Sequence, residues 1–62
     1  MPELIFPTEL LSADRQDDVL KFIAALPVPP PRRKRALQRW ADLVGAVIDR
    51  DDVEEVTGVT GI

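Results

Sequence analysis

Carboxylates are the side chains of this sequence with the widest chemical scope, because the chain has no histidine, cysteine or tyrosine. They include three adjacent pairs, Asp17-Asp18, Asp51-Asp52 and Glu54-Glu55. Two carboxylates divide acid and base roles only where a pocket separates their environments. Adjacent acids on exposed helix faces have no such walls, and a chain of 62 residues can hardly build them. We therefore expect a protein that is not an enzyme.

Other catalytic and ligand-binding motifs are missing from the sequence. Ser12 and the three threonines suit a helix cap, a turn or a tail rather than a nucleophile. No glycine-rich phosphate loop is present, and the run Asp49–Asp52 lacks the glycine and the distal glutamate of a calcium-binding EF-hand loop. The sequence thus predicts no catalytic residue, no cofactor and no bound metal.

A basic cluster, Arg32-Arg33-Lys34-Arg35, is followed one helical turn later by Arg39. The segments on either side are acidic, so the charge is distributed in acidic, basic and acidic blocks around a net value of −3. The cluster could meet an acidic protein surface or phosphates, or it could be solvated and paired within the chain. We expect nucleic acid to be the less favoured partner, because no aromatic side chains are interleaved with these cations.

A second charged surface is expected near the C-terminus, where five acids lie within residues 49–55. Residues 37–57 resemble the front half of a DNA-binding helix-turn-helix, but the second helix would be repelled by phosphates. An acidic helix on such a frame suits a basic protein surface instead. The residues of this candidate partner surface are Asp51, Asp52, Glu54 and Glu55.

Two further features carry weaker signals for partner binding. Pro27, Pro30 and Arg32 match a P-x-x-P-x-R pattern that SH3-type grooves bind, although a rigid hinge explains the prolines as well. Trp40 is the one large anchor residue, and tryptophan and arginine are enriched among interface hot spots. Trp40 would equally suit the centre of a small core, so both roles stay open.

Helices are needed to position these residues, and the apolar spacing predicts three of them. Side chains spaced by three and four residues indicate helices at about 13–26, 31–44 and 50–57, with Ser12 and Asp49 as N-caps. Pro27 ends the first helix, and residues 27–31 favour a stiff polyproline connector. Gly45 closes the second helix, although a continuous helix from 31 to Asp49 is the competing interpretation.

The remaining segments are short. We expect residues 1–7 to form an extended N-terminal arm that packs on the helices of its own chain or on a second copy. We expect residues 60–62 to form a frayed tail. We expect residues 1–62 to form a single small all-α domain, its last two helices packed as in a helix-turn-helix. A chain this short has a marginal core, so a homodimer or a protein partner could complete it. Without a leader peptide or membrane span, we expect a cytoplasmic protein.

Several runs of residues together cover about half of the chain: LPVPPPRRKRAL at 26–37, Trp40-Ala41, Gly45 and DDVEEVTG at 51–58. In these runs the sequence resembles the QseM-type antiactivators, small proteins of rhizobial mobile elements that restrain quorum-sensing regulators of the LuxR class. The resemblance implies a bacterial protein that binds a transcriptional activator and blocks it. It assigns no functional residue.

Three hypotheses of function follow from these observations. The first is a regulatory protein that binds and inhibits a transcriptional activator, with Trp40, the arginines Arg32, Arg33 and Arg35, and the acids of 51–55 as candidate contacts. The second is a small DNA-binding or recombination accessory protein that uses Arg32–Arg35. The third is a structural subunit that assembles through the arm Leu4–Phe6.

Overall fold

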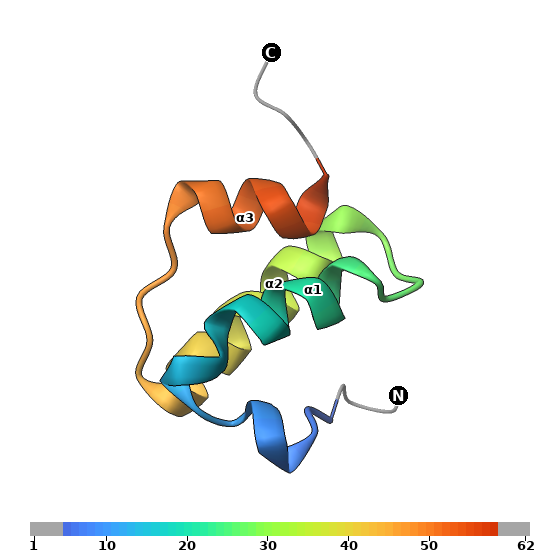
Figure 1. Ribbon diagram of the computed structural model, residues 1–62. Coiled ribbons are helices and arrows are strands. Elements are labelled where there is room, and N and C mark those ends of the chain that lie inside the picture. Colours follow the sequence, from blue (N-terminus) through green and yellow to red (C-terminus); the bar gives the residue numbers. More distant parts are fainter. Residues whose placement is uncertain (1–4, 59–62) are drawn as a thin grey trace.

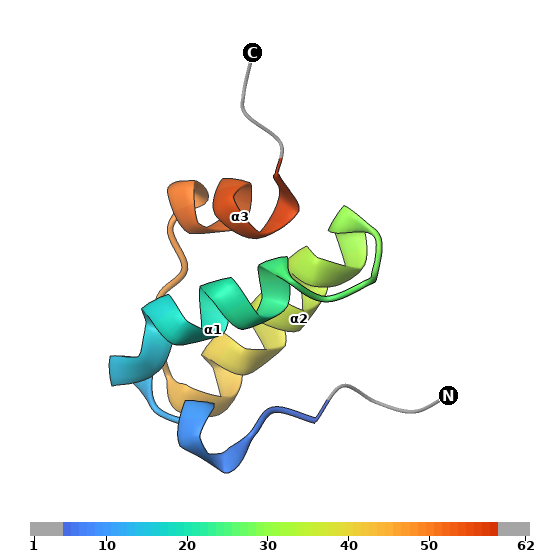
Figure 2. The same ribbon diagram turned by 45° about the vertical axis from the view of Figure 1, so that its right-hand side comes forward.

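The computed structural model describes residues 5–58, and this part of the chain is all-α, as the sequence predicts. Two short 3-10 turns, Thr8–Leu10 and Ala13–Arg15, precede three α-helices and no strand is present within 5–58. The helices are α1 (Gln16–Ala24), α2 (Pro30–Val44) and α3 (Arg50–Thr57). Figures 1 and 2 show α1 and α2 side by side, with α3 packed on one side of the pair and the N-terminal segment on the other.

The first helix is shorter at both ends than the periodicity predicts. Ser12 does act as a cap, since its Oγ accepts a hydrogen bond from Asp14 N at 3.4 Å, but it caps the 3-10 turn rather than α1. Arg15, the last residue of that turn and the N-cap of α1, has the non-helical angles φ −98° and ψ 22°. At the other end Leu26 N bonds to Ile23 O at 3.0 Å, which tightens the chain before Pro27.

The second helix begins one residue earlier than predicted. Pro29 has the extended angles of polyproline, φ −62° and ψ 152°, and its carbonyl accepts hydrogen bonds from Arg32 N and Arg33 N at 3.0 and 3.2 Å. Pro30 and Pro31 therefore occupy the first two helical positions, where a missing N–H leaves no bond unmade.

Glycines end both α2 and α3. Gly45 has φ +70°, and Ala46 N bonds back to Ala41 O at 2.9 Å, so the competing continuous helix to Asp49 is wrong. Gly58 also has φ +70°, and its N–H bonds to Glu54 O at 2.8 Å. Asp49 occupies the N-cap position of α3 with extended backbone, but its side chain makes no capping bond.

The core forms where the three helices and the N-terminal segment meet. Its buried members are Phe6, Val19, Leu20, Ile23, Leu37, Trp40, Ala41 and Val56. Burying one large apolar side chain contributes about 1.5–3 kcal/mol, so a core of this size can support a small domain. Phe6 brings the N-terminal segment onto the body, where its ring lies 6.0 Å from that of Phe22.

The buried Phe6 bears on the hypothesis that the N-terminal arm joins copies. In this structure Phe6 is buried in the core of its own chain, whereas the neighbouring Ile5 is 85% exposed. Leu4 lies outside the described residues, as does the tail at 60–62. The prediction that the arm packs on the body is confirmed for Phe6.

Candidate functional site

Arg33 is the cation of the basic cluster that the fold itself uses. Its guanidinium donates hydrogen bonds to Leu26 O at 3.1 Å and to Val56 O at 3.4 Å. Leu26 lies just beyond the end of α1 and Val56 lies in the last turn of α3. One side chain thus joins the C-terminal ends of two helices to the first turn of α2.

This contact explains how a helix tolerates positive charge at its N-terminus. Cations there are disfavoured by about 0.3–1 kcal/mol each, but they are favoured near the negative end of a helix dipole. The guanidinium of Arg33 lies near two such ends, those of α1 and α3. Arg33 is also one of the residues predicted to contact a partner, which stays a prediction; the structure gives it a bridging position within the molecule.

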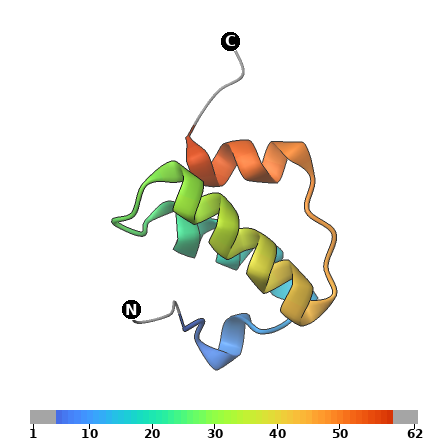
Figure 3. The ribbon, with the colours of Figure 1, turned by 180° about the vertical axis from the view of Figure 1, so that it is seen from behind.

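The other cations of the cluster lie at the surface. Arg32, Lys34 and Arg35 are exposed, and no hydrogen bond or ion pair engages them within the described part of the chain. Arg32 and Arg35 share the side of α2 that faces away from α1, together with Arg39 and Leu43. Figure 3 views the molecule from the side on which α2 lies in front. We call these four residues the outer face of α2.

Leu43 adds an apolar group to the outer face, and the sequence reasoning missed it. Its side chain is 65% exposed, although leucine is a residue that usually lies inside. The signal was present in the sequence, because Leu43 follows Arg39 by one helical turn on the side opposite the buried Leu37 and Ala41.

The four acids proposed for partner binding divide into two groups. Asp52 is half-buried and accepts a hydrogen bond from Gln16 Nε2 of α1, and Glu54 lies 3.6 Å from Arg50 Nε in an ion pair one turn long. Asp52 therefore helps to hold α3 against α1. The Arg50–Glu54 pair is largely exposed and contributes little to stability.

Asp51 and Glu55 form the second group. Both are exposed and neither makes a hydrogen bond or ion pair within residues 5–58. They are four residues apart on α3, so their carboxylates lie one above the other on one side of the helix. We call this pair the acidic face of α3.

Trp40 lies at the centre of the core and is 0% exposed. Its indole Nε1 donates a hydrogen bond to Leu10 O, which fastens the first 3-10 turn to α2. Of the two roles that the sequence left open, the structure gives Trp40 the one in the core. A partner could contact Trp40 only if the segments that cover it moved.

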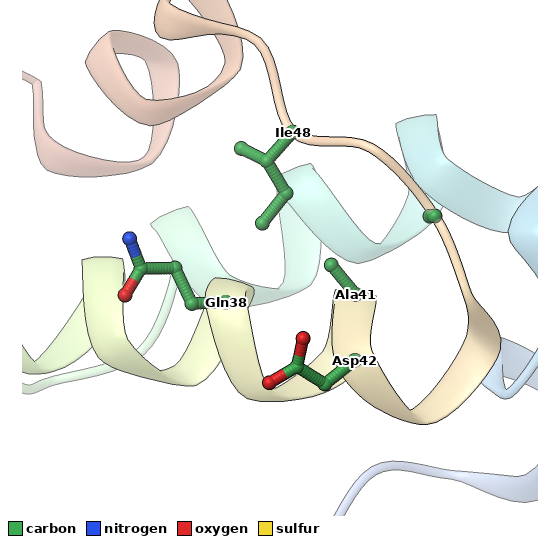
Figure 4. Close-up of a pocket in the computed structure, with 5 residues that line it drawn as sticks. Gln38, Ala41, Asp42 and Ile48 are labelled. Carbon is green, nitrogen blue, oxygen red and sulfur yellow. The ribbon is translucent and has the colours of Figure 1, made fainter.

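A shallow, open hollow lies between α2 and the connection to α3. It is about 340 Å³ in volume and is lined by Gln38, Ala41, Asp42, Ala46 and Ile48. Figure 4 shows Ile48 above Ala41, with the polar ends of Gln38 and Asp42 on the helix side. It brings together a carboxylate and an amide, and the side chains that line it include no hydroxyl or amine that could work with them.

The two motif-based interpretations change in the folded chain. Pro30 of the P-x-x-P-x-R pattern begins α2, so the segment is not the continuous polyproline helix that SH3-type grooves bind. Residues 45–49 connect α2 to α3, but α3 presents acids to solvent where a recognition helix would need to approach phosphates.

Comparisons with known proteins give no family for this chain. No protein-family model, no curated protein and no solved structure matches it. Within residues 5–58 no group of three or more metal-ligating side chains is present, and no helix there is long and apolar enough to cross a membrane. The all-α fold and the two charged surfaces are thus the observations on which a function can be argued.

Proposed function

We propose that this protein is a regulator that binds a transcriptional activator and inhibits it by docking the acidic face of α3 on a basic surface. The observation that carries the proposal is the exposure of Asp51 and Glu55, which make no hydrogen bond or ion pair within residues 5–58. The resemblance of residues 26–58 to QseM-type antiactivators supports the same function.

The chemistry of a DNA-binding surface explains why such a partner suits this helix. A surface that attracts phosphates is lined by lysine and arginine, and it attracts carboxylates for the same electrostatic reason. Arginine pairs with carboxylates through two parallel hydrogen bonds, which makes the interaction directional as well as attractive. A small acidic helix can therefore compete with DNA for that surface.

The direct test compares how much activator is captured by the wild-type chain and by a double variant with reversed charges. The variant Asp51→Lys with Glu55→Lys should lose the activator that the wild-type chain retains from native lysate after nuclease treatment. We expect affinity to fall about tenfold or more, because each attractive contact becomes a like-charge contact. Asp52 and Glu54 are left unchanged, so that the Gln16 and Arg50 contacts persist.

The matched control is Asp14→Lys with Asp17→Lys. These acids are exposed, the change in net charge is the same, and one acid of each pair lies in the first turn of an α-helix, Asp17 in α1 and Asp51 in α3. The control should keep the activator. Equal loss in both variants, or recovery by the wild type of DNA alone from untreated lysate, would contradict the proposal.

A further inference from the structure

The outer face of α2 is a second surface that the acidic face of α3 does not explain. It holds Arg32, Arg35, Arg39 and Leu43 along one side of a helix whose other side is buried against the core. Arg32 and Arg35 stand near the N-terminus of α2, the end of a helix that disfavours positive charge. Of the four cations at 32–35, Arg33 is the one that has hydrogen-bond partners within residues 5–58, the carbonyls of Leu26 and Val56.

We infer that the outer face of α2 binds an acidic segment of a partner protein that carries an apolar residue beside its carboxylates. Arg32 and Arg35 receive the carboxylates, and Leu43 receives the apolar side chain. Arg35 and Leu43 are eight positions apart, which is about 12 Å along the helix, so the carboxylate and the apolar side chain of the partner are separated by about two helical turns.

Charge complementarity selects this class of partner. Arg32 and Arg35 carry positive charge that no ion pair in the described part of the chain balances, and an anionic partner relieves their repulsion at the helix N-terminus. The guanidinium group binds carboxylates in a two-point geometry that a lysine cannot reproduce.

Nucleic acid fits the same surface less well. Base stacking needs exposed aromatic rings, but Trp40 and Phe6 are buried and Phe22 is half-buried against the core. The whole chain carries a net charge of −3, and a duplex carries a far denser line of negative charge than a short acidic segment, so the net repulsion is stronger against nucleic acid. A DNA backbone would also leave Leu43 against phosphates, where it gains nothing.

An anionic membrane surface is the other alternative to an acidic protein segment. Binding in the interface of a bilayer requires a broad apolar side of a helix, with several large side chains. The outer face of α2 offers a single exposed leucine beside three arginines. A protein segment that pairs carboxylates with one apolar contact matches this composition better.

The probe is a synthetic helical peptide with two glutamates and one leucine on one side, two turns apart. A second peptide of the same composition places the leucine on the opposite side. Binding is measured by the change in polarisation of a dye on each peptide, at about 0.1 M salt, where exposed charges separated by more than about 10 Å are largely screened. A 20-base-pair duplex and vesicles of anionic lipid serve as the competing probes.

The wild-type chain should bind the patterned peptide with about fivefold higher affinity than the rearranged one. This is the affinity that one partly buried leucine contributes. Arg32→Glu with Arg35→Glu should weaken binding about tenfold or more. Leu43→Asn should remove the preference between the two peptides. Circular dichroism should report an unchanged helix content for these variants, because glutamate suits the first turns of a helix and Leu43 is exposed.

The matched control is Lys21→Glu with Arg50→Glu, which makes the same change of net charge at exposed positions on α1 and α3. Equal weakening in the control, no preference between the peptides, or tighter binding of the duplex or the vesicles would overturn the inference. Asp51→Lys with Glu55→Lys should not weaken peptide binding, so failure of the proposed function and failure of this inference are distinguishable.

Discussion

The inner and outer sides of α2 differ in what their residues do, although the two sides alternate along the same fifteen residues. The inner side buries Leu37, Trp40 and Ala41 and directs Arg33 toward the ends of two other helices. The outer side carries Arg32, Arg35, Arg39 and Leu43 toward solvent. Residues of the same type therefore have different roles because helical periodicity places them on opposite sides.

The same division occurs in α3, with the charge reversed. Asp52 bonds to Gln16 of α1, whereas its neighbour Asp51 has no partner within residues 5–58. In both helices one charged residue of a run is used by the fold and the adjacent one is left to solvent. A surface for a partner is best sought among the residues that the fold does not use.

The largest expected change in the free energy of unfolding comes from Trp40. We compare it with Leu43, another large apolar residue three positions away on α2. Trp40→Ala should cost about 3–5 kcal/mol, because it empties the core and removes the bond to Leu10 O. A chain of this length is stable by only about 3–9 kcal/mol, so the variant should be largely unfolded.

Leu43→Ala is the control for that prediction and should change the free energy of unfolding by less than about 0.5 kcal/mol, as exposed substitutions do. Urea unfolding followed by circular dichroism measures both variants. A stable Trp40→Ala chain would show that the core does not depend on this side chain.

The next comparison is between Arg33 and Arg32, which are adjacent in sequence. Arg33→Ala should destabilise the fold by about 1–3 kcal/mol, because the carbonyls of Leu26 and Val56 lose their donor. Arg32→Ala should leave stability within about 0.5 kcal/mol of the wild type. Thermal unfolding separates the two, and equal effects would contradict the division of α2 into two sides.

Gly45 tests the point at which α2 stops. Its φ of +70° suits glycine, and a side chain there is strained, so Gly45→Ala should cost about 1 kcal/mol. Open space surrounds the position, so the cost should come from the backbone alone. Gly45→Asn should recover part of the loss, since asparagine tolerates this conformation; an alanine variant as stable as the wild type would contradict the assignment.

The smallest expected difference in stability is between alanine variants of Asp52 and Asp51. Both lie in the first turn of α3 and interact with its dipole, so alanine at either position removes a similar contribution. Asp52→Ala also removes the bond from Gln16, and we expect it to be less stable than Asp51→Ala by about 0.5–1.5 kcal/mol. Denaturant midpoints of the two variants measure this difference, and identical midpoints would mean that the Gln16 contact contributes nothing.

Local sequence signals predicted the helices and their ends where a single residue decides them. Gly45 and Gly58 end α2 and α3 as expected, and Pro27 keeps α1 from extending further. The start of α1 was placed too early, because the spacing of apolar residues does not distinguish a 3-10 turn from the first turn of an α-helix.

The roles of individual charged residues could not be read from the sequence, because they depend on contacts between distant segments. Arg33 looks like its neighbours until the ends of α1 and α3 are brought beside it. Asp52 likewise depends on Gln16, which lies in another helix. For Trp40 both roles were open, and packing against the N-terminal segment decides between them.

The measurement that tests the proposed function most directly is binding of the captured activator to its own DNA site, with and without this protein. If the acidic face of α3 covers the basic surface of the activator, adding the chain should release the DNA, and the Asp51→Lys, Glu55→Lys variant should not. An activator that stays on its DNA while the wild-type chain is bound to it would contradict this account.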